Sequence, residues 1–152
     1  MVVRVIIFLV INFAALALGS IFTSAGVSSD WYTNLNQAPW TPPGWVFGAA
    51  WTSIMIFFAF YMAYAYKIVG NRRRLITIFI IQWILNVSWN PVFFKLHLVT
   101  NGLILITSLT ILIGVFLFGY YKELKAKVFF VLPYFIWLLI ATSLNAYILL
   151  YN

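Results

Sequence analysis

Five long apolar runs, separated by polar stretches, make up most of the chain. We expect each run to be a helix, over residues 3–25, 44–66, 75–94, 102–121 and 128–149. A helix of about twenty residues, rising about 1.5 Å per residue, crosses the roughly 30 Å hydrocarbon core of a bilayer. The pattern therefore predicts an all-α, polytopic membrane protein, in which residues 1–152 form a single domain of five transmembrane helices.

Only one of the polar stretches is long. Residues 26–43 contain Gly, Ser, Asp, Asn and Pro without helical periodicity, so we expect a long loop between the first and second helices. Pro42 and Pro43 cannot donate backbone hydrogen bonds, but they suit the first turn of a helix, where the N–H groups have no intrahelical partner. The second helix should begin directly after them.

The first apolar run has an alternative interpretation as a cleaved signal peptide. Arg4 precedes its uncharged part, Val5 to Phe22, and Ala15-Leu16-Ala17 resembles a cleavage site. The run continues to Phe22, however, and outlasts the apolar core of a typical signal peptide. We therefore favour a first membrane-spanning helix.

Composition places the chain in the bilayer. It is 65% hydrophobic and only 7% charged, whereas a soluble domain carries about a quarter of its residues charged. The absence of cysteine excludes thiolate chemistry, and one histidine cannot form a metal site alone, so we expect no metal and no cofactor. That histidine, His97, lies beside Lys95 and is interpreted as an interface residue.

The basic residues lie at the ends of the apolar runs and indicate a topology. With five spans, one side collects eight of the nine, namely Arg4, Lys67, Arg72, Arg73, Arg74, Lys122, Lys125 and Lys127. The other side has only Lys95. The positive-inside rule then predicts a cytoplasmic N-terminus, with the 26–43 loop and the C-terminus across what we expect to be a bacterial cell membrane. Because no aromatic-basic patch accompanies these charges, we expect the lipid bilayer as a partner, and no nucleic acid.

Unusual residues gather on three helix faces on the loop side of the membrane. The faces are Gln82, Asn86, Trp89, Asn90 and Phe93 on the third helix; Phe47, Trp51, Met55, Phe58 and Met62 on the second; and Tyr134, Trp137, Ala141 and Asn145 on the fifth. Three faces at one depth can line a cavity beneath the loop. Pro133 is expected to kink the fifth helix and to widen the bundle there.

Each of these residues also has a purely structural interpretation. Tryptophans at membrane interfaces form ordinary aromatic belts, which would account for Trp31, Trp40 and Trp45. The deeper tryptophans could serve helix packing. The amides of Asn86 and Asn90 could instead bond neighbouring helices.

A cavity with such a lining suits flat, apolar ligands. Aromatic faces stack on flat molecules, and a few amides orient a polar edge. The spans contain no carboxylate, so a proton-relay transporter or an ion pump lacks its usual parts. No nucleophile-base pair or metal set is present, so the spacing does not indicate an enzyme.

Three motifs in order resemble those of the translocator protein family, also called tryptophan-rich sensory proteins. Trp40, Pro42, Pro43, Phe47 and Trp51 match W-x-P-P-x-x-x-F-x-x-x-W in register. The other two motifs are residues 86–94 and residues 132–137, the latter followed by Ala141, Thr142 and Asn145. The sterol-contact pattern of the family is absent here, because no basic residue follows Tyr147.

The resemblance implies a receptor, sensor or transporter for tetrapyrroles such as protoporphyrin and haem, for sterols, and for drugs of the benzodiazepine-site class. The candidate ligand-binding residues are Tyr32, Trp40, Pro42, Phe47, Trp51, Asn86, Trp89, Asn90, Phe93, Trp137, Ala141 and Asn145. One alternative is a porphyrin-degrading enzyme in which Trp51 and Trp137 act as redox-active aromatics. A second is a structural, partner-binding membrane protein.

The resemblance also implies a homodimer. Small residues four apart let helices approach closely, and the chain has three such pairs, Ala15 with Gly19, Gly44 with Gly48, and Ala59 with Ala63. The same pairs could serve packing within one bundle.

Overall fold

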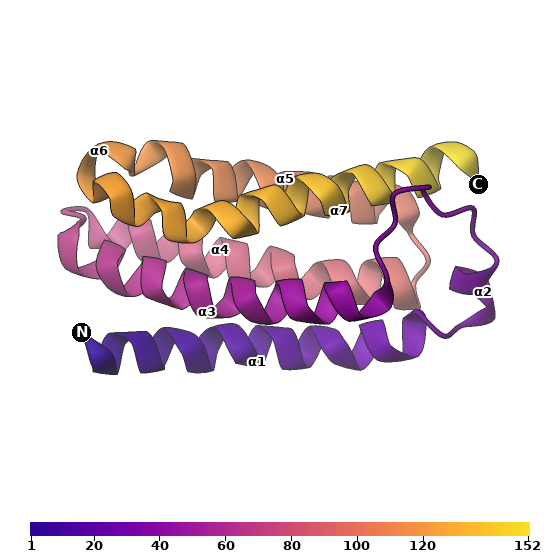
Figure 1. Ribbon diagram of the computed structural model, residues 1–152, viewed down its shortest axis with the longest axis horizontal. Coiled ribbons are helices and arrows are strands. Elements are labelled where there is room, and N and C mark those ends of the chain that lie inside the picture. The colour runs from indigo at the N-terminus through magenta and orange to yellow at the C-terminus, as the bar shows by residue number, and fades with distance from the viewer.

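Five helices in the computed structural model, which describes residues 1–152, are long and apolar enough to cross a membrane. The long α-helices are α1 (Val2–Gly26), α3 (Gly44–Ile68), α4 (Arg72–Asn90), α5 (Val99–Gly114) and α7 (Leu132–Tyr151). Figure 1 shows them side by side in one bundle, with the N- and C-termini at opposite ends. The predicted all-α membrane fold is confirmed.

Short irregular helices extend three of the spans. A π-helical segment, Pro91–Lys95, continues α4, and a second one, Val115–Gly119, continues α5. The short helix α6 (Tyr121–Leu124) and a 3-10 segment, Lys125–Val131, precede α7. These segments keep backbone hydrogen bonds inside the span, as a bilayer requires.

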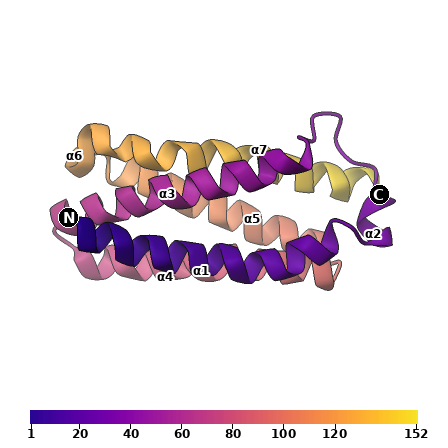
Figure 2. The same ribbon diagram turned by 60° about the horizontal axis from the view of Figure 1, so that its bottom comes forward.

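The helices form a ring in the order α1, α3, α7, α5, α4. Helix α1 packs against α3 and α4, while α5 packs against α4 and α7. Figure 2 shows α1 running along α4. The ring closes where α3 meets the 3-10 segment Lys125–Val131, and α3 contacts α7 itself only sparsely, so these two helices diverge toward the loop end.

Aromatic side chains fill the centre of the ring. Phe58 of α3 packs edge-on against Phe116 and Tyr134, each at a ring-centroid distance of 5.4 Å. The Tyr61 hydroxyl donates a hydrogen bond of 2.6 Å to the backbone carbonyl of Phe116 in the second π-helical segment. All four side chains are almost completely buried, so they form a closely packed core in the part of the bundle farther from the loop.

Pro133 does not kink a helix, contrary to the prediction. Helix α7 begins at Leu132, and Pro133 therefore lies in its first turn, directly after the 3-10 segment. Proline has no backbone N–H, and a first-turn residue has no intrahelical acceptor for one, so no hydrogen bond is lost there. The residue marks a change of helix type.

The long loop contains a short helix that the sequence pattern did not predict. Helix α2 (Asp30–Thr33) is capped by Ser29, whose hydroxyl accepts a hydrogen bond of 3.2 Å from the Tyr32 backbone N–H. Further along the loop, the Asn36 backbone N–H donates to Oδ1 of Asn152 at 2.7 Å. The loop is therefore attached to the end of α7, and Figure 1 shows α2 at the end of the bundle where the C-terminus lies.

Candidate functional site

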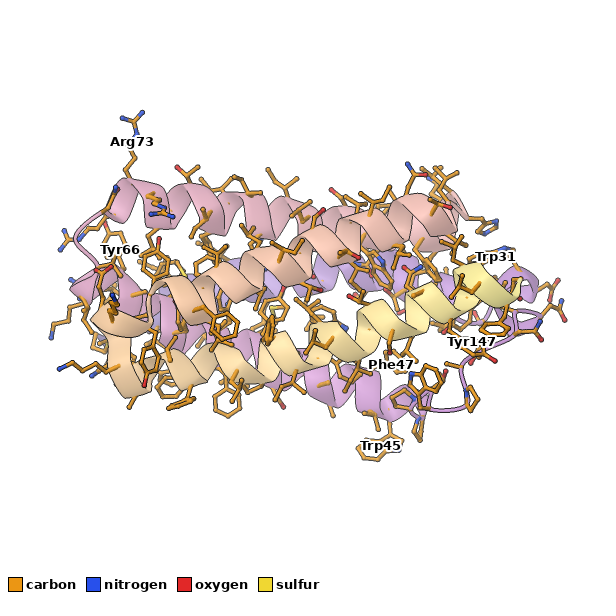
Figure 3. All side chains as sticks on the ribbon, turned by 90° about the horizontal axis from the view of Figure 1, so that it is seen from above. Trp31, Trp45, Phe47, Tyr66, Arg73 and Tyr147 are labelled. Atoms are coloured by element: carbon orange, nitrogen blue, oxygen red, sulfur yellow. The ribbon has the colours of Figure 1, made fainter.

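The interior of the bundle, between the core and the loop, contains a pair of aromatic contacts that join α3 to α7. Phe47 meets Trp137 edge-on at 5.3 Å, and one turn further along α3, Trp51 meets Tyr134 edge-on at 5.8 Å. Figure 3 shows Phe47 beside α7. Because α3 and α7 otherwise contact each other sparsely, these rings are the main connection between the two helices at this depth.

Two buried polar atoms in this region have no hydrogen-bond partner. Gln82 of α4 is 2% exposed and donates through Nε2 to the Tyr134 hydroxyl at 2.8 Å, but its Oε1 is unpaired. The indole N–H of Trp137 is also buried and unpaired. Nearly all buried polar groups in proteins are hydrogen-bonded, so each unpaired atom needs an explanation. Here the unpaired acceptor belongs to a residue of α4 that bonds Tyr134, and the unpaired donor belongs to Trp137, one turn beyond Tyr134 on α7.

Other residues of the interior faces lie near these atoms. Asn86 is buried one turn beyond Gln82 on α4, and Ala141 follows Trp137 by one turn on α7 and packs against the core. The interior group is therefore Phe47, Trp51, Asn86, Trp137 and Ala141 among the predicted site residues, together with Gln82 and Tyr134.

A second group closes the loop end of the bundle. Trp89 stacks on Phe93 at 5.2 Å and donates from Nε1 to Oδ1 of Asn145 at 3.2 Å. Tyr32 of α2 lies against Phe93 and Phe94 at ring-centroid distances of 6.4 and 5.5 Å. Burial raises the pKa of the Tyr32 phenol above its ordinary value, so it remains neutral. These residues form a lid of aromatic rings over the interior.

Glycine permits the close packing of this lid. A Cβ atom added at Gly102 of α5 would lie 3.1 Å from the Phe93 ring and 3.3 Å from Oδ1 of Asn145. Asn145 also donates through Nδ2 to the Val99 backbone carbonyl at 3.3 Å. Its amide is therefore engaged with α4 and α5, as the structural interpretation of the asparagines allows.

The structure places three predicted site residues away from the interior. Asn90 bonds α1, because its Oδ1 accepts a hydrogen bond of 2.6 Å from the Thr23 hydroxyl. Trp40 is 54% exposed and donates to the Ser143 hydroxyl at 3.1 Å. Pro42 is half-buried in the extended stretch before α3.

Sequence reasoning left some interior residues out of the candidate set. Gln82 and Tyr134 lie on the predicted faces, and a glutamine inside an apolar run was a usable indication. No comparable feature of the sequence indicates that α1 packs against a predicted site residue. Gly19 approaches Asn90 so closely that an added Cβ would lie 2.6 Å from Asn90 Nδ2, a contact that spacing along the chain does not reveal.

Comparison with known proteins agrees with the three motifs. The model of the TspO/MBR family matches residues 7–151. The chain is 34% identical over 154 residues to "Tryptophan-rich protein TspO" of Archaeoglobus fulgidus, covering 100% of this chain and 96% of that one. It is 32% identical over 117 residues to "Tryptophan-rich sensory protein" of Cereibacter sphaeroides, covering 76% and 73% of the two chains. It is 28% identical over 134 residues to "Protein CrtK" of Rhodobacter capsulatus, covering 85% and 80%.

Proposed function

This chain belongs to the TspO/MBR family, and from that premise we propose that it is a membrane receptor or sensor that binds a flat lipophilic ligand of the tetrapyrrole class. The ligand would lie inside a single five-helix domain, between α3, α4 and α7. A relative bears the name of a sensory protein, and that name supports a sensing role for this chain.

The observation that carries the proposal is the pair of unpaired buried atoms, Oε1 of Gln82 and Nε1 of Trp137, among aromatic faces. A tetrapyrrole offers a large flat face for stacking, pyrrole N–H groups that donate, and carboxylates that accept. Sterols and drugs of the benzodiazepine-site class suit the aromatic part of the lining but present fewer polar groups. The tetrapyrrole class therefore uses more of what this interior offers.

A ligand needs room, and the α3–α7 boundary is where room can open. Phe47 and Trp51 now contact Trp137 and Tyr134 directly. Since α3 contacts α7 itself only sparsely, separating the two helices would part mainly these rings and the contact of Phe58 with Tyr134. A ligand inserted between the rings would replace one set of aromatic contacts by another.

Titration with protoporphyrin in the dark tests this proposal, with tryptophan quenching and porphyrin absorption as readouts. Trp137→Phe retains a ring against Phe47 but removes the N–H donor, so affinity should fall by roughly twofold to tenfold, as for one lost hydrogen bond of about 0.5–1.5 kcal/mol. The control is Trp45→Phe, because Trp45 is 75% exposed on the outer face of the bundle. Unchanged affinity in Trp137→Phe would contradict the placement, and no binding by the wild type would favour a structural protein.

Porphyrin degradation is the second candidate function. Trp51 lies against Tyr134, and Trp137 follows one turn later, so three oxidisable aromatic side chains adjoin where the ligand would bind. Illumination of the complex in the presence of oxygen separates the two functions. A receptor leaves the porphyrin spectrum intact, whereas an enzyme yields a product band that disappears in Trp51→Phe or Trp137→Phe.

A further inference from the structure

A groove separate from the candidate site runs between α1 and α4 on the outer face of the bundle. Its volume is about 650 Å³, within the roughly 300–1,000 Å³ range of small-molecule sites. Ile7 of α1 and Ile80 of α4 form its sides, and Trp83 lines it toward the loop end. Arg4 and Tyr66 line it at the opposite end.

The sides of the groove are apolar and open to the bilayer. Ile7 is 49% exposed and Ile80 is 52% exposed. The only polar atom of the Trp83 side chain is already paired, since Nε1 donates to the Ile11 backbone carbonyl at 3.0 Å. The groove therefore presents a hydrocarbon surface to which an acyl chain can bind.

The side chains of two arginines lie near the same aromatic ring, Tyr66, at one end of the groove. The Cζ atom of Arg4 lies 5.9 Å from the centroid of the Tyr66 ring, and that of Arg72 lies 5.3 Å from it. Figure 3 shows Tyr66 at the same end of the bundle as Arg73, whose side chain projects away from the helices. Arg4 thus lines the groove, and Arg72 lies against the same lining ring, Tyr66.

Little negative charge is available to balance these arginines. The chain has only two acidic residues. Asp30 lies in α2 at the far end of the bundle, and Glu123 accepts a hydrogen bond of 3.4 Å from the backbone N–H of Gly70. An anion beside this ring would offer both guanidinium groups charge-assisted hydrogen bonds.

We propose that this groove binds one anionic phospholipid of the surrounding leaflet. Its phosphate lies beside Tyr66, within reach of Arg4 and Arg72, and an acyl chain follows the apolar sides toward Trp83. Basic pockets between transmembrane helices commonly bind anionic head groups. A second copy of the chain is a poorer occupant, since a dimer with its two-fold axis along the membrane normal would bring the basic ends of both copies together.

Native mass spectrometry of the purified, detergent-solubilised chain with equal amounts of phosphatidylglycerol and phosphatidylcholine tests the proposal. The wild type should retain one phosphatidylglycerol in clear preference to phosphatidylcholine. Since each basic residue near an anionic lipid surface contributes about a fivefold change in affinity, Arg4→Gln with Arg72→Gln should weaken phosphatidylglycerol binding by about 25-fold. The matched control, Arg73→Gln with Lys122→Gln, removes the same charge away from the groove and should retain the preference.

A second variant separates the groove from folding and from general charge. Ile80→Trp fills the groove but leaves both arginines in place, and because Ile80 is half-exposed the substitution does not overpack the core. It should also lose the bound phosphatidylglycerol. Equal retention of both lipids by the wild type would overturn the proposal, as would equal losses in the two charge variants. Disulfide cross-linking between copies through Ile7→Cys or Ile80→Cys, in a chain without other cysteines, would identify a second copy as the occupant and overturn it as well.

Discussion

Trp89 of α4 donates a hydrogen bond of 3.2 Å to Oδ1 of Asn145 on α7, two helices that α5 separates in the ring. Asn145 then donates to the Val99 backbone carbonyl at the start of α5. One amide thus joins three helices beneath the loop. Bilayer interiors offer no competing partners, so this connection should contribute to the stability of the loop end.

The first prediction concerns that bond. Trp89→Phe and Asn145→Leu should each destabilise the protein, and together they should destabilise it by less than the sum of the two effects. The coupling should be about 0.6–1 kcal/mol, the usual range for hydrogen bonds between membrane helices. Unfolding by denaturing detergent measures it for the four proteins of the cycle. Strict additivity of the two substitutions would show that the bond contributes nothing.

The second prediction compares two glycines. A Cβ atom at Gly26 would lie 2.5 Å from Cβ and Cγ of Phe94, atoms too close to the backbone to move aside, whereas nothing lies within 4 Å of one at Gly48. Gly26→Ala should therefore destabilise the protein by about 1–3 kcal/mol through overpacking. Gly48→Ala should be neutral or stabilising by up to about 1 kcal/mol, because alanine favours helix. Thermal unfolding in mild detergent measures both, and equal stabilities would contradict the close approach of α1 to the end of α4.

The third prediction concerns Ala141. A phenylalanine there would place a ring in the space where we expect the ligand, among the residues of the interior group. Porphyrin affinity should therefore fall by roughly tenfold to a hundredfold while the fold is retained. Ala65 of α3 is not a suitable control position, because it is completely buried and Ala65→Phe would disrupt the core. Ala49→Phe is the better control, because Ala49 is exposed on α3, two residues beyond Phe47, which contacts Trp137 one turn before Ala141. Equal porphyrin affinities for the wild type and Ala141→Phe would show that the porphyrin binds elsewhere.

The fourth prediction is the topology. Eight of nine basic residues lie on the side of the N-terminus, so residues 26–43 should lie outside the cytoplasm. Ser29→Cys, the sole cysteine of its variant, should react with an impermeant maleimide added to intact cells. Lys122→Cys should react only after the membrane is opened. The reverse order of labelling would invert the topology.

The fifth prediction is the homodimer, for which the structure narrows the choice of interface. Ala15 and Gly19 are buried within the bundle, and so are Ala59 and Ala63. These pairs serve packing within one chain. Gly44 and Gly48 remain exposed, so Gly48→Leu should weaken the dimer if that face forms it. Mass measurements in mild detergent across a concentration series should show a wild-type dimer, and a monomer throughout would count against the dimer itself.

Much of the candidate site follows from the repeat of aromatic and amide residues at helical spacing. Trp51, Asn86 and Trp137 were identified from that repeat, and the structure places all three on inner faces near Gln82 and Tyr134. Asn90 shows what helical spacing does not predict. It follows Trp89 by one residue, which turns it by about 100° on the helix and toward α1, where Thr23 pairs with it.

The sequence by itself determined that the chain crosses a membrane five times, because the length and hydrophobicity of a span are properties of consecutive residues. Tertiary structure alone decided which polar atoms were left without partners. Both polar atoms of the Asn145 amide have partners, while Oε1 of Gln82 and Nε1 of Trp137 have none, although all three residues lie on predicted faces. Hydrogen bonds between helices depend on the order and separation of those helices in the ring, and hydrophobic periodicity along one helix carries no information about its neighbours.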